Sequence, residues 1–320
     1  MSHETEPAQV QETVKRARFQ KKKKFAILLS YCGQGYLGMQ FNHGFKTIEG
    51  ELFQAFLKLG IMDDDSLSTP QSIHFQRAAR TDKGVILLYF LLKTSLNENL
   101  CKELNSLLPH CVKVLAVRKV TAGFNSKTAC DSRSYAYVMP TFAFASKEVA
   151  PSHQFRLMSE TLDQVNSLLS PAQDPSCKRY VTQFSCSLPF IVKEAEFVKI
   201  TIKGQSFMLH QIRKMIGLTI AIMRGYTSKE ILEKAFKMER VNIPTAPSLN
   251  LLLEEPHYDS YNRRYGSDGV HEALDWSSCA VDIGCPDGGS MKNWLLTSLP
   301  LHTYEFPLKP EEKLSDPVCE

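Results

Sequence analysis

The chain has 320 residues, of which 43% are hydrophobic and 22% charged, and its formal net charge is +4 at pH 7. This composition is typical of a globular protein and excludes a wholly disordered chain. No apolar stretch approaches the roughly 20 residues of a membrane span, so we expect no membrane contact. The nine cysteines include no C-x-x-C pair, which favours reduced thiols and predicts no metal site.

Residues 1–24 are predicted to form a basic, disordered leader. The segment 15–24 reads KRARFQKKKK and contains most of the excess positive charge. Such a block is typical of nuclear targeting or nucleic-acid contact and also of a solvated tail, and the block alone favours the tail. The residues before it contain three glutamates and no apolar h-region, so they resemble neither a secretory signal nor a transit peptide.

Residues 25–125 are predicted to form a first half in which strands and helices alternate. An apolar strand is expected over 25–31, and a helix runs from the N-cap candidate Thr47 to Gly60. Beyond the loop DDDSLSTPQS, three further elements are expected: a strand over 85–92, a helix over 97–108 and a strand over 112–120.

Residues 126–276 are predicted to form a second half, and residues 277–320 a loose tail. Over 131–139 the residues alternate with period two, which predicts a strand whose polar face bears Tyr135 and Tyr137. Four further elements are expected: a helix over 159–169, a strand over 196–204, an apolar helix over 206–224, and a helix from Thr227 with a capping box closed by Glu230.

Three glycines spell the dinucleotide-binding pattern G-x-G-x-x-G directly after the first predicted strand: Gly33, Gly35 and Gly38. That pattern requires a helix that opens on the phosphates, whereas the turn-like MQFNHGF follows here. We therefore interpret the glycines as turn residues. A nucleotide-dependent enzyme remains a hypothesis for function, ranked behind the two that are given below.

A polar cluster precedes the strand predicted over 85–92, within the stretch FQRAARTDKGVILLYF. It places one carboxylate, Asp82, among the cations Arg77, Arg80 and Lys83. One interpretation is a charged surface turn. The other is a nucleophile whose negative charge is stabilised by a partner elsewhere in the chain.

The apolar helix over 206–224 contains a stripe with helical spacing, formed by His210, Arg213, Lys214 and Gly217. A helix that is apolar on nearly every side is buried, so Arg213 either needs an anion or reaches water from the helix edge. Asp82 is a plausible anionic partner. Gly217 would let another backbone approach the helix closely.

Several segments resemble the TruA-type tRNA pseudouridine synthases. RAARTDKGV resembles their catalytic R-T-D-x-G-V core, and SYCGQGYLGMQ their N-terminal tyrosine-and-glycine segment. GFNSKTACDSRSYAYVMPTFAFA resembles the strand with the active-site tyrosine, and KGQSFMLHQIRKMIG the motif with the arginine that pairs with the catalytic aspartate. APSLNLLLEEPHYDSYNRRYGSDGVHEALDW is similar to the closing segment of the eukaryotic branch, tRNA pseudouridine synthase 1. The segments are collinear over about residues 25–276.

The resemblance implies an isomerase that converts uridine to pseudouridine in tRNA, around the anticodon stem and loop, without a cofactor. It assigns Asp82 as nucleophile, Arg80 as base-flipping residue, Tyr135 as the aromatic that stacks on the base, and Arg213 as partner of the aspartate. We also expect RNA contacts from four further residues: Lys83, Asn125, Lys127 and His210.

The implied fold is α+β: a pseudouridine synthase fold in which two α/β halves share an extended, mostly antiparallel sheet with a basic RNA cleft. The expected partners are tRNA and, as further candidates, other RNAs. The protein is expected to be a monomer or weak homodimer in the nucleus, with the cytoplasm and mitochondrion as alternatives.

Two departures from the family pattern leave a second hypothesis open, an inactive RNA-binding paralogue of the same fold. The strand after Asp82 reads ILLYFLL, where the family has small residues and a Gly-Gln pair. Bulky side chains there would fill the space that the substrate needs or shift the strand register. The loop over 170–178 is also shorter than the family's.

Overall fold

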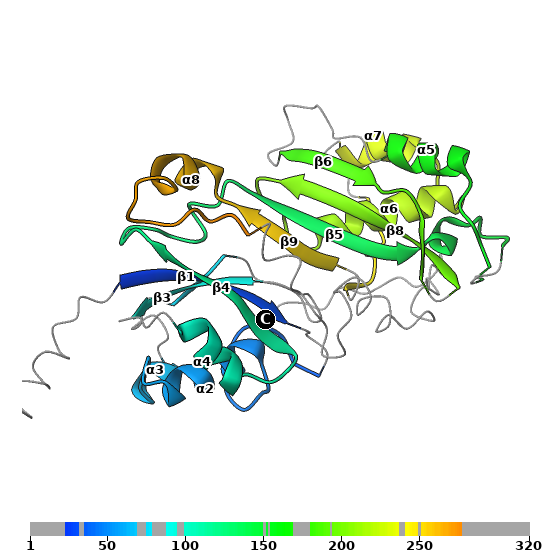
Figure 1. The fold of residues 1–320 in the computed structure, drawn as a ribbon. Coiled ribbons are helices and arrows are strands. Elements are labelled where there is room, and N and C mark those ends of the chain that lie inside the picture. Colours follow the sequence, from blue (N-terminus) through cyan, green and yellow to red (C-terminus); the bar gives the residue numbers. More distant parts are fainter. Residues whose placement is uncertain are drawn as a thin grey trace, which may run out of the picture. The chain divides into compact units, whose positions relative to one another are not determined.

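The structure is a computed structural model with two compact units (Figure 1). It describes residues 23–31, 35–68, 75–78, 88–94, 99–149, 152, 154–168, 180–192, 194–236, 241–248 and 251–276, with the backbone alone for 68, 88–94 and 236. Among these residues, the first unit takes those up to Ser132 and those from Glu255 onward, and the second takes Arg133–Glu254. The halves expected at 25–125 and 126–276 stay a prediction, and the expected tail lies outside the described residues.

The first unit is built on a four-stranded sheet with the order β2-β3-β1-β4. Its strands are β1 (Lys23–Tyr31), β2 (Gln76–Arg77), β3 (Leu88–Thr94) and β4 (Val112–Val120). β1 pairs antiparallel with both β3 and β4. Residues 25–29 are all buried, which explains their unbroken apolar run. The expected leader is too long by two residues, because Lys23 and Lys24 already pair with β3.

Helices cover both faces of this sheet (Figure 1). α2 (Ile48–Lys58), α3 (Asp65–Ser68) and α4 (Leu100–Leu107) lie on one face, and α8 (Asp259–Tyr265) lies on the other. The core on the α2 side includes Ile27 and Leu29 of β1, Phe53 of α2 and Leu104 of α4. Thr47 is the predicted N-cap, since its Oγ1 accepts a hydrogen bond from Gly50 N at 3.2 Å.

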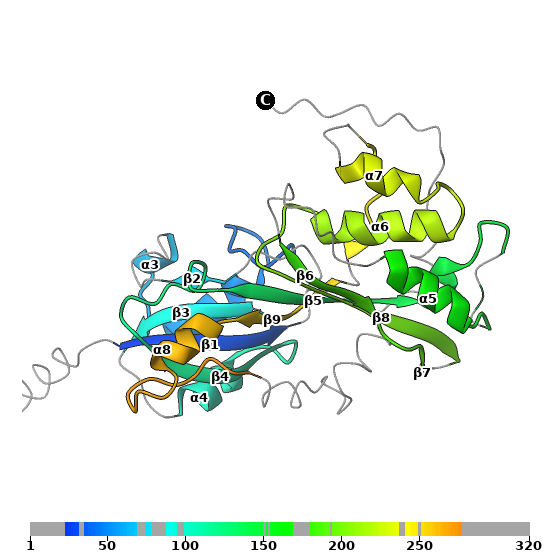
Figure 2. The same cartoon turned by 90° about the horizontal axis from the view of Figure 1, so that it is seen from above.

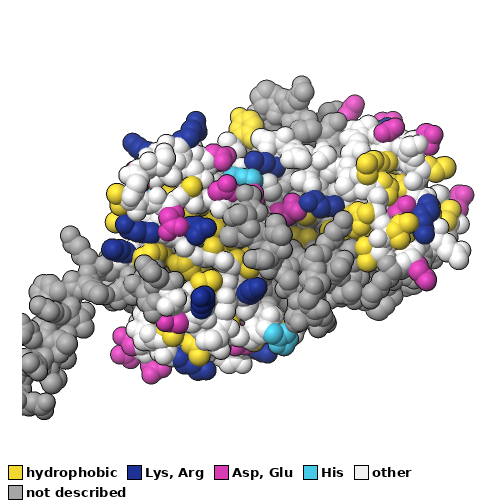
Figure 3. Space-filling model, viewed as in Figure 1, with side chains coloured by type: hydrophobic (Ala, Val, Ile, Leu, Met, Phe, Trp, Pro, Cys, Tyr) yellow, Lys and Arg dark blue, Asp and Glu magenta, His cyan; other side chains and the backbone are white. Residues whose placement is uncertain are grey.

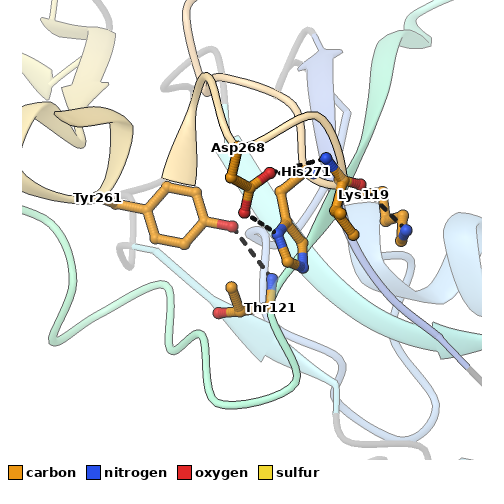
Figure 4. A network of polar contacts seen from close by, with 6 residues as sticks. Lys119, Thr121, Tyr261, Asp268 and His271 are labelled. Carbon is orange, nitrogen blue, oxygen red and sulfur yellow. Dashed lines mark hydrogen bonds and ion pairs between the residues drawn. The ribbon is translucent and has the colours of Figure 1, made fainter. Parts of the chain in front are cut away.

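A polar network binds α8 and the loop after it to the end of β4 and to Thr121, the residue that follows it (Figure 4). The Tyr261 hydroxyl accepts a hydrogen bond from Thr121 N at 3.1 Å, and Lys119 Nζ donates to Val270 O at 3.0 Å. Within the loop, Asp268 lies 2.6 Å from His271 Nδ1 and accepts from the amides of Val270 and His271. These hydrogen bonds lower the pKa of Asp268 to about 2. α8 and the loop after it therefore form an outer layer of the first unit.

The second unit is built on a sheet with the order β6-β8-β5-β9, and β7 pairs with β8. β5 and β8 are antiparallel, with Tyr135 opposite Ile202, and the strands predicted over 131–139 and 196–204 are confirmed to within one residue. The strands are β5 (Ser132–Pro140), β6 (Val181–Cys186), β7 (Phe190–Val192), β8 (Ala195–Gly204) and β9 (Leu251–His257).

Three α-helices lie on the same side of this second sheet (Figure 2). They are α5 (Ser159–Leu168), α6 (Gln211–Met223) and α7 (Glu230–Phe236), and a 3₁₀ turn, η2 (Thr141–Phe144), follows β5. The expected polar face of β5 is wrong beyond its first residues, because Tyr137 packs in the core with Ile212 and Ile216 of α6.

Two helices of the second unit start later than their sequences predict. α6 begins at Gln211, not at 206, because His210 has a left-handed backbone (φ 56°) and ends the preceding turn. α7 begins at Glu230, three residues after the expected N-cap Thr227. Ser228 instead donates a side-chain hydrogen bond to Glu230, which lowers the pKa of that carboxyl.

Replacement of Gly217 by alanine is expected to lower the free energy of unfolding. A Cβ atom on Gly217 would collide with the carbonyl oxygen of Pro244 and lie 3.0 Å from its carbonyl carbon. We expect a loss of more than about 2 kcal/mol, which outweighs a gain of at most about 1 kcal/mol in helix propensity. The measurement is urea denaturation of the purified variant.

The matched control is Gly123→Ala in the first unit, where an added Cβ would meet nothing within 4 Å. Its unfolding free energy should stay within about 0.5 kcal/mol of the parent. Equal midpoints for the Gly217→Ala variant and the parent would contradict the close approach.

Candidate active site

The structure describes five of the eight residues that the sequence singles out. Arg80, Asp82 and Lys83 lie outside the described residues. Asn125 and Lys127 belong to the first unit, and Tyr135, His210 and Arg213 to the second: the site is therefore built here unit by unit.

Arg213 lies on the first turn of α6 and is half-buried. Its Nε donates a hydrogen bond of 2.7 Å to Ala246 O. Its backbone carbonyl accepts from Ala246 N at 3.0 Å. The family resemblance implies an anionic partner for this guanidinium, and the partner seen at Nε is a neutral backbone carbonyl. The anion stays a prediction.

Gly217, one turn further along α6, has the role that its place on the stripe predicts. A Cβ atom on Gly217 would collide with Pro244 O and lie 3.3 Å from Ala246 N. A larger residue would push this backbone away from the helix, so the hydrogen bonds between Ala246 and Arg213 depend on the glycine. Lys214, beside Arg213 on the stripe, is exposed to solvent.

Tyr135 of β5 lies against an aromatic residue that the sequence does not single out. Phe207 packs edge-on to the Tyr135 ring, with 5.3 Å between ring centroids and an interplanar angle of 88°. Gly204 makes room for Phe207, because a Cβ there would lie 2.9 Å from the Phe207 ring. A perpendicular contact between two rings restricts their relative tilt.

The turn from β8 to α6 is fixed at both of its ends. Gln205 N donates to Tyr180 O at 3.1 Å, and its carbonyl accepts from Arg133 at 3.3 Å. At the other end Met208 N donates to the side chain of Gln211 at 2.8 Å. The turn therefore presents Phe207 to Tyr135 from a defined backbone. His210, at the end of this turn, is exposed.

In the first unit, an ion pair anchors the strand that leads into the polar cluster. Arg77 of β2 contacts both carboxylate oxygens of Glu49 on α2, at 2.6 and 2.8 Å. Glu49 is 0% exposed and Arg77 25% exposed, and Glu49 also accepts from Phe41 N at 2.7 Å. This pair therefore joins β2 to α2.

The sequence contains a signal for Glu49 that our prediction did not use. Glu49, Leu52, Phe53 and Phe56 recur at i, i+3, i+4 and i+7, and all four side chains are buried. A carboxylate in that stripe requires a cation. The position of the cation, 28 residues further along the chain, is set by the fold.

Asn125 and Lys127 lie in the turn between β4 and β5. The Asn125 side chain accepts from the amides of Lys127 and Thr128 at 3.0 and 3.1 Å, so it shapes the turn. Lys127 is exposed. The face drawn in Figure 3 shows Lys and Arg side chains interspersed with Asp and Glu. The roles of Asn125 and Lys127 in RNA binding stay predictions.

Neither a metal cluster nor a membrane-spanning helix is found in the part of the chain that the structure describes. No group of three or more His, Cys, Asp or Glu side chains there is placed to bind a metal ion. No helix there is long and apolar enough to cross a bilayer. The four described cysteines, which are Cys101, Cys111, Cys130 and Cys186, are free thiols.

Comparison with known proteins identifies the family. The sequence pattern of a family described as tRNA pseudouridine synthase matches residues 153–259, which include Phe207, Arg213 and Ala246. The pseudouridylate synthase 1 homolog of Homo sapiens is 41% identical over 313 aligned positions that cover 87% of this chain and 73% of the relative. The chain belongs to the tRNA pseudouridine synthase family. This confirms the family predicted from the motifs and its class, an isomerase.

Two further relatives extend this result. The mouse pseudouridylate synthase 1 homolog is 40% identical, covering 88% of this chain and 75% of the relative. A protein of Yarrowia lipolytica named tRNA pseudouridine synthase 1 is 32% identical, covering 79% of this chain and 67% of the relative. The alignment with the human relative has 313 positions, which is more than 87% of the 320-residue chain. That synthase therefore has residues within the aligned region that this chain lacks.

Replacement of Glu49 by alanine is expected to destabilise the protein by about 3 kcal/mol, because the change leaves Arg77 without its buried carboxylate. Urea denaturation measures the loss. The Glu49→Met, Arg77→Met double variant should recover a part of it, since no uncompensated charge remains.

Glu51→Gln on the same helix is the control. Glu51 is 28% exposed and lies 4.0 Å from Lys46, so this exchange should cost less than about 1 kcal/mol. If the Glu49→Ala and Glu51→Gln variants lose equal stability, the ion pair of Glu49 is not an anchor.

Proposed function

We propose that this protein converts uridine to pseudouridine in tRNA, with Asp82 as the nucleophile. The observation that carries the proposal is the 41% identity to a pseudouridylate synthase 1 homolog over 87% of the chain. The motif RAARTDKGV, which contains Asp82, supplies the reactive carboxylate.

The reaction is an isomerisation and needs no external reagent. The bond between ribose C1′ and N1 of uracil breaks, the base turns, and C1′ bonds to C5. The proton lost from C5 is balanced by one gained at N1. The base must leave its stack before Asp82 reaches it, and Arg80 is proposed to occupy the position that the base vacates. Enclosure keeps the detached uracil in the site.

Arg213 is proposed to stabilise the negative charge of Asp82. Its Nε is engaged by Ala246 O, so the terminal nitrogens would bind the carboxylate. The carbonyl of Ala246 is neutral, so this contact does not neutralise the guanidinium. An adjacent arginine favours the ionised form of a carboxyl, which is the form that attacks.

Tyr135 is proposed to stack on the uracil ring. The edge-on contact with Phe207 supports this role, because it restricts the tyrosine ring without covering both of its faces. Stacking on an aromatic contributes about 1–3 kcal/mol per base, enough to retain a base that has left the helix.

RNA binding is proposed to take place in a basic cleft over an antiparallel sheet shared by both halves, with the tRNA anticodon stem and loop as target. Lys83, Asn125, Lys127 and His210 would contact the RNA. The exposure of Lys127 and His210 supports their availability. A nuclear location is proposed from the basic block at 15–24.

A second candidate function is RNA binding without catalysis. It is favoured by the sequence ILLYFLL after Asp82, whose bulky residues replace small ones. Incubation of the protein with a uridine-containing tRNA transcript, scored for pseudouridine by mass spectrometry, decides between the two. Intact tRNA binding without product would support the second function.

Replacement of Asp82 by asparagine is expected to abolish pseudouridine formation, because an amide cannot act as the nucleophile. The dissociation constant for tRNA should change by less than about twofold, since phosphate contacts dominate the affinity. Single-turnover assays and filter binding measure the two quantities. A turnover rate close to wild type would exclude Asp82 as the nucleophile.

Replacement of Arg213 by alanine is expected to reduce both stability and activity. It leaves Ala246 O without its donor and the proposed partner Asp82 without its cation. The free energy of unfolding should fall by about 2–4 kcal/mol. Lys214→Ala, one residue along the same helix and exposed, should change it by less than about 0.5 kcal/mol. Equal unfolding midpoints for the two variants would contradict the role of Arg213.

A further inference from the structure

A short backbone segment, 244–247, forms hydrogen bonds with Arg213 and also contacts α6 and β5. Ala246 forms a reciprocal pair with Arg213, in which Ala246 N donates to the Arg213 carbonyl at 3.0 Å and Ala246 O accepts from Arg213 Nε at 2.7 Å. Ala246 is 0% exposed. Water therefore does not compete for its two hydrogen bonds.

Each side of Ala246 has its own anchor. Before it, Pro244 O lies against α6 at Gly217. After it, Pro247 O accepts a hydrogen bond of 3.0 Å from the hydroxyl of Tyr137, which comes from β5 and is 0% exposed. The carbonyl that holds the guanidinium is thus located between a contact to α6 and a contact to β5.

Such an arrangement determines a direction as well as a position. A guanidinium is a rigid plane with five N–H donors, so fixing Nε fixes where the other four point. Movement of Ala246 O would rotate that plane around the arginine side chain. Tyr137 is the side chain that prevents this movement from the β5 side.

We propose that Tyr137 is a positioning residue, which holds the Arg213 guanidinium through Pro247 and Ala246 in the orientation that pairs with the catalytic carboxylate. The inference rests on the proposed function. It assigns a role in the reaction to Tyr137, the second tyrosine of the sequence YAY. This residue lies in the core, so the proposed role needs no contact with the base or a phosphate.

The test uses Tyr137→Phe, which removes one hydroxyl and retains the ring. The expected result is a single-turnover rate reduced by about two- to tenfold, the factor that one net hydrogen bond represents. The dissociation constant for tRNA should change less than about twofold, since no phosphate contact is removed.

The first unit offers a matched control. Tyr258 is 2% exposed, and its hydroxyl also donates to a backbone carbonyl at 3.0 Å, that of Ser126. Tyr258→Phe should lower the melting temperature by a similar amount and leave the single-turnover rate unchanged. Equal rate losses in the two variants, or none in Tyr137→Phe, would overturn the proposal.

A double-mutant cycle with Arg213→Lys tests the path of the effect. A lysine has no Nε plane to orient, so Tyr137→Phe should have no additional effect on the rate in that background. The same fold loss in both backgrounds would mean that Tyr137 acts independently of Arg213, and the proposal would fail.

A readout that needs no activity separates this inference from the proposed function. Selective ¹⁵N labelling of arginine allows hydrogen exchange at the Arg213 Nε–H to be followed by NMR. Exchange should be faster in Tyr137→Phe than in the parent or in Tyr258→Phe. If the parent is inactive and exchange is still faster in Tyr137→Phe, the contact is retained and the proposed function is rejected. If the parent is active and exchange in Tyr137→Phe equals that in the parent, the inference alone is rejected.

Discussion

The reciprocal hydrogen-bond pair between Arg213 and Ala246 is the contact on which the candidate site depends. It gives a charged group a fixed direction without neutralising it, because its acceptor is a carbonyl dipole and no carboxylate. Its geometry requires a glycine at 217, since only a residue without Cβ admits the backbone of Pro244. A single small residue thus controls the orientation of a guanidinium one turn away.

In the first unit a helix also binds a segment distant in sequence, but through a buried carboxylate and not through a guanidinium. There a fully buried carboxylate, that of Glu49, joins α2 to β2 through Arg77 and to Phe41 N. Breaking such a pair is costly because one charge stays behind in a dry environment. In both units, a side chain in a helix binds a backbone segment or strand that is distant in sequence.

Much of the fold could be predicted from local pattern, and the misses have physical causes. The strand predicted over 112–120 and the cap at Thr47 follow from residue periodicity and from the side-chain oxygen that an N-cap needs. The early start predicted for α6 fails because apolar spacing continues through 206–210, while the backbone there turns at His210. The buried face of β5 was missed because tyrosine suits both a polar surface and a core, and only the packing of α6 decides between them.

The candidate site could be predicted only where a single residue requires a particular neighbour. A half-buried arginine predicts a hydrogen-bond or ionic partner, and a glycine on the same stripe of the helix predicts a close backbone contact. Neither residue tells which segment of the chain packs against it. Ala246, 33 residues from Arg213, could therefore not be found without the fold. The contact of Phe207 with Tyr135 could not be predicted either, since a phenylalanine after a strand can pack against many different core residues.

The order of the two units along the chain has a consequence for synthesis on the ribosome. Among the described residues the second unit occupies one uninterrupted stretch, Arg133–Glu254, whereas the first needs α8 and the polar loop after it to complete its outer layer. A nascent chain therefore contains all described residues of the second unit once Glu254 has emerged, while the earlier-made sheet still exposes the face that α8 will cover. Nascent β1 and β4 must remain unaggregated during that interval, and the chain finishes its oldest part last.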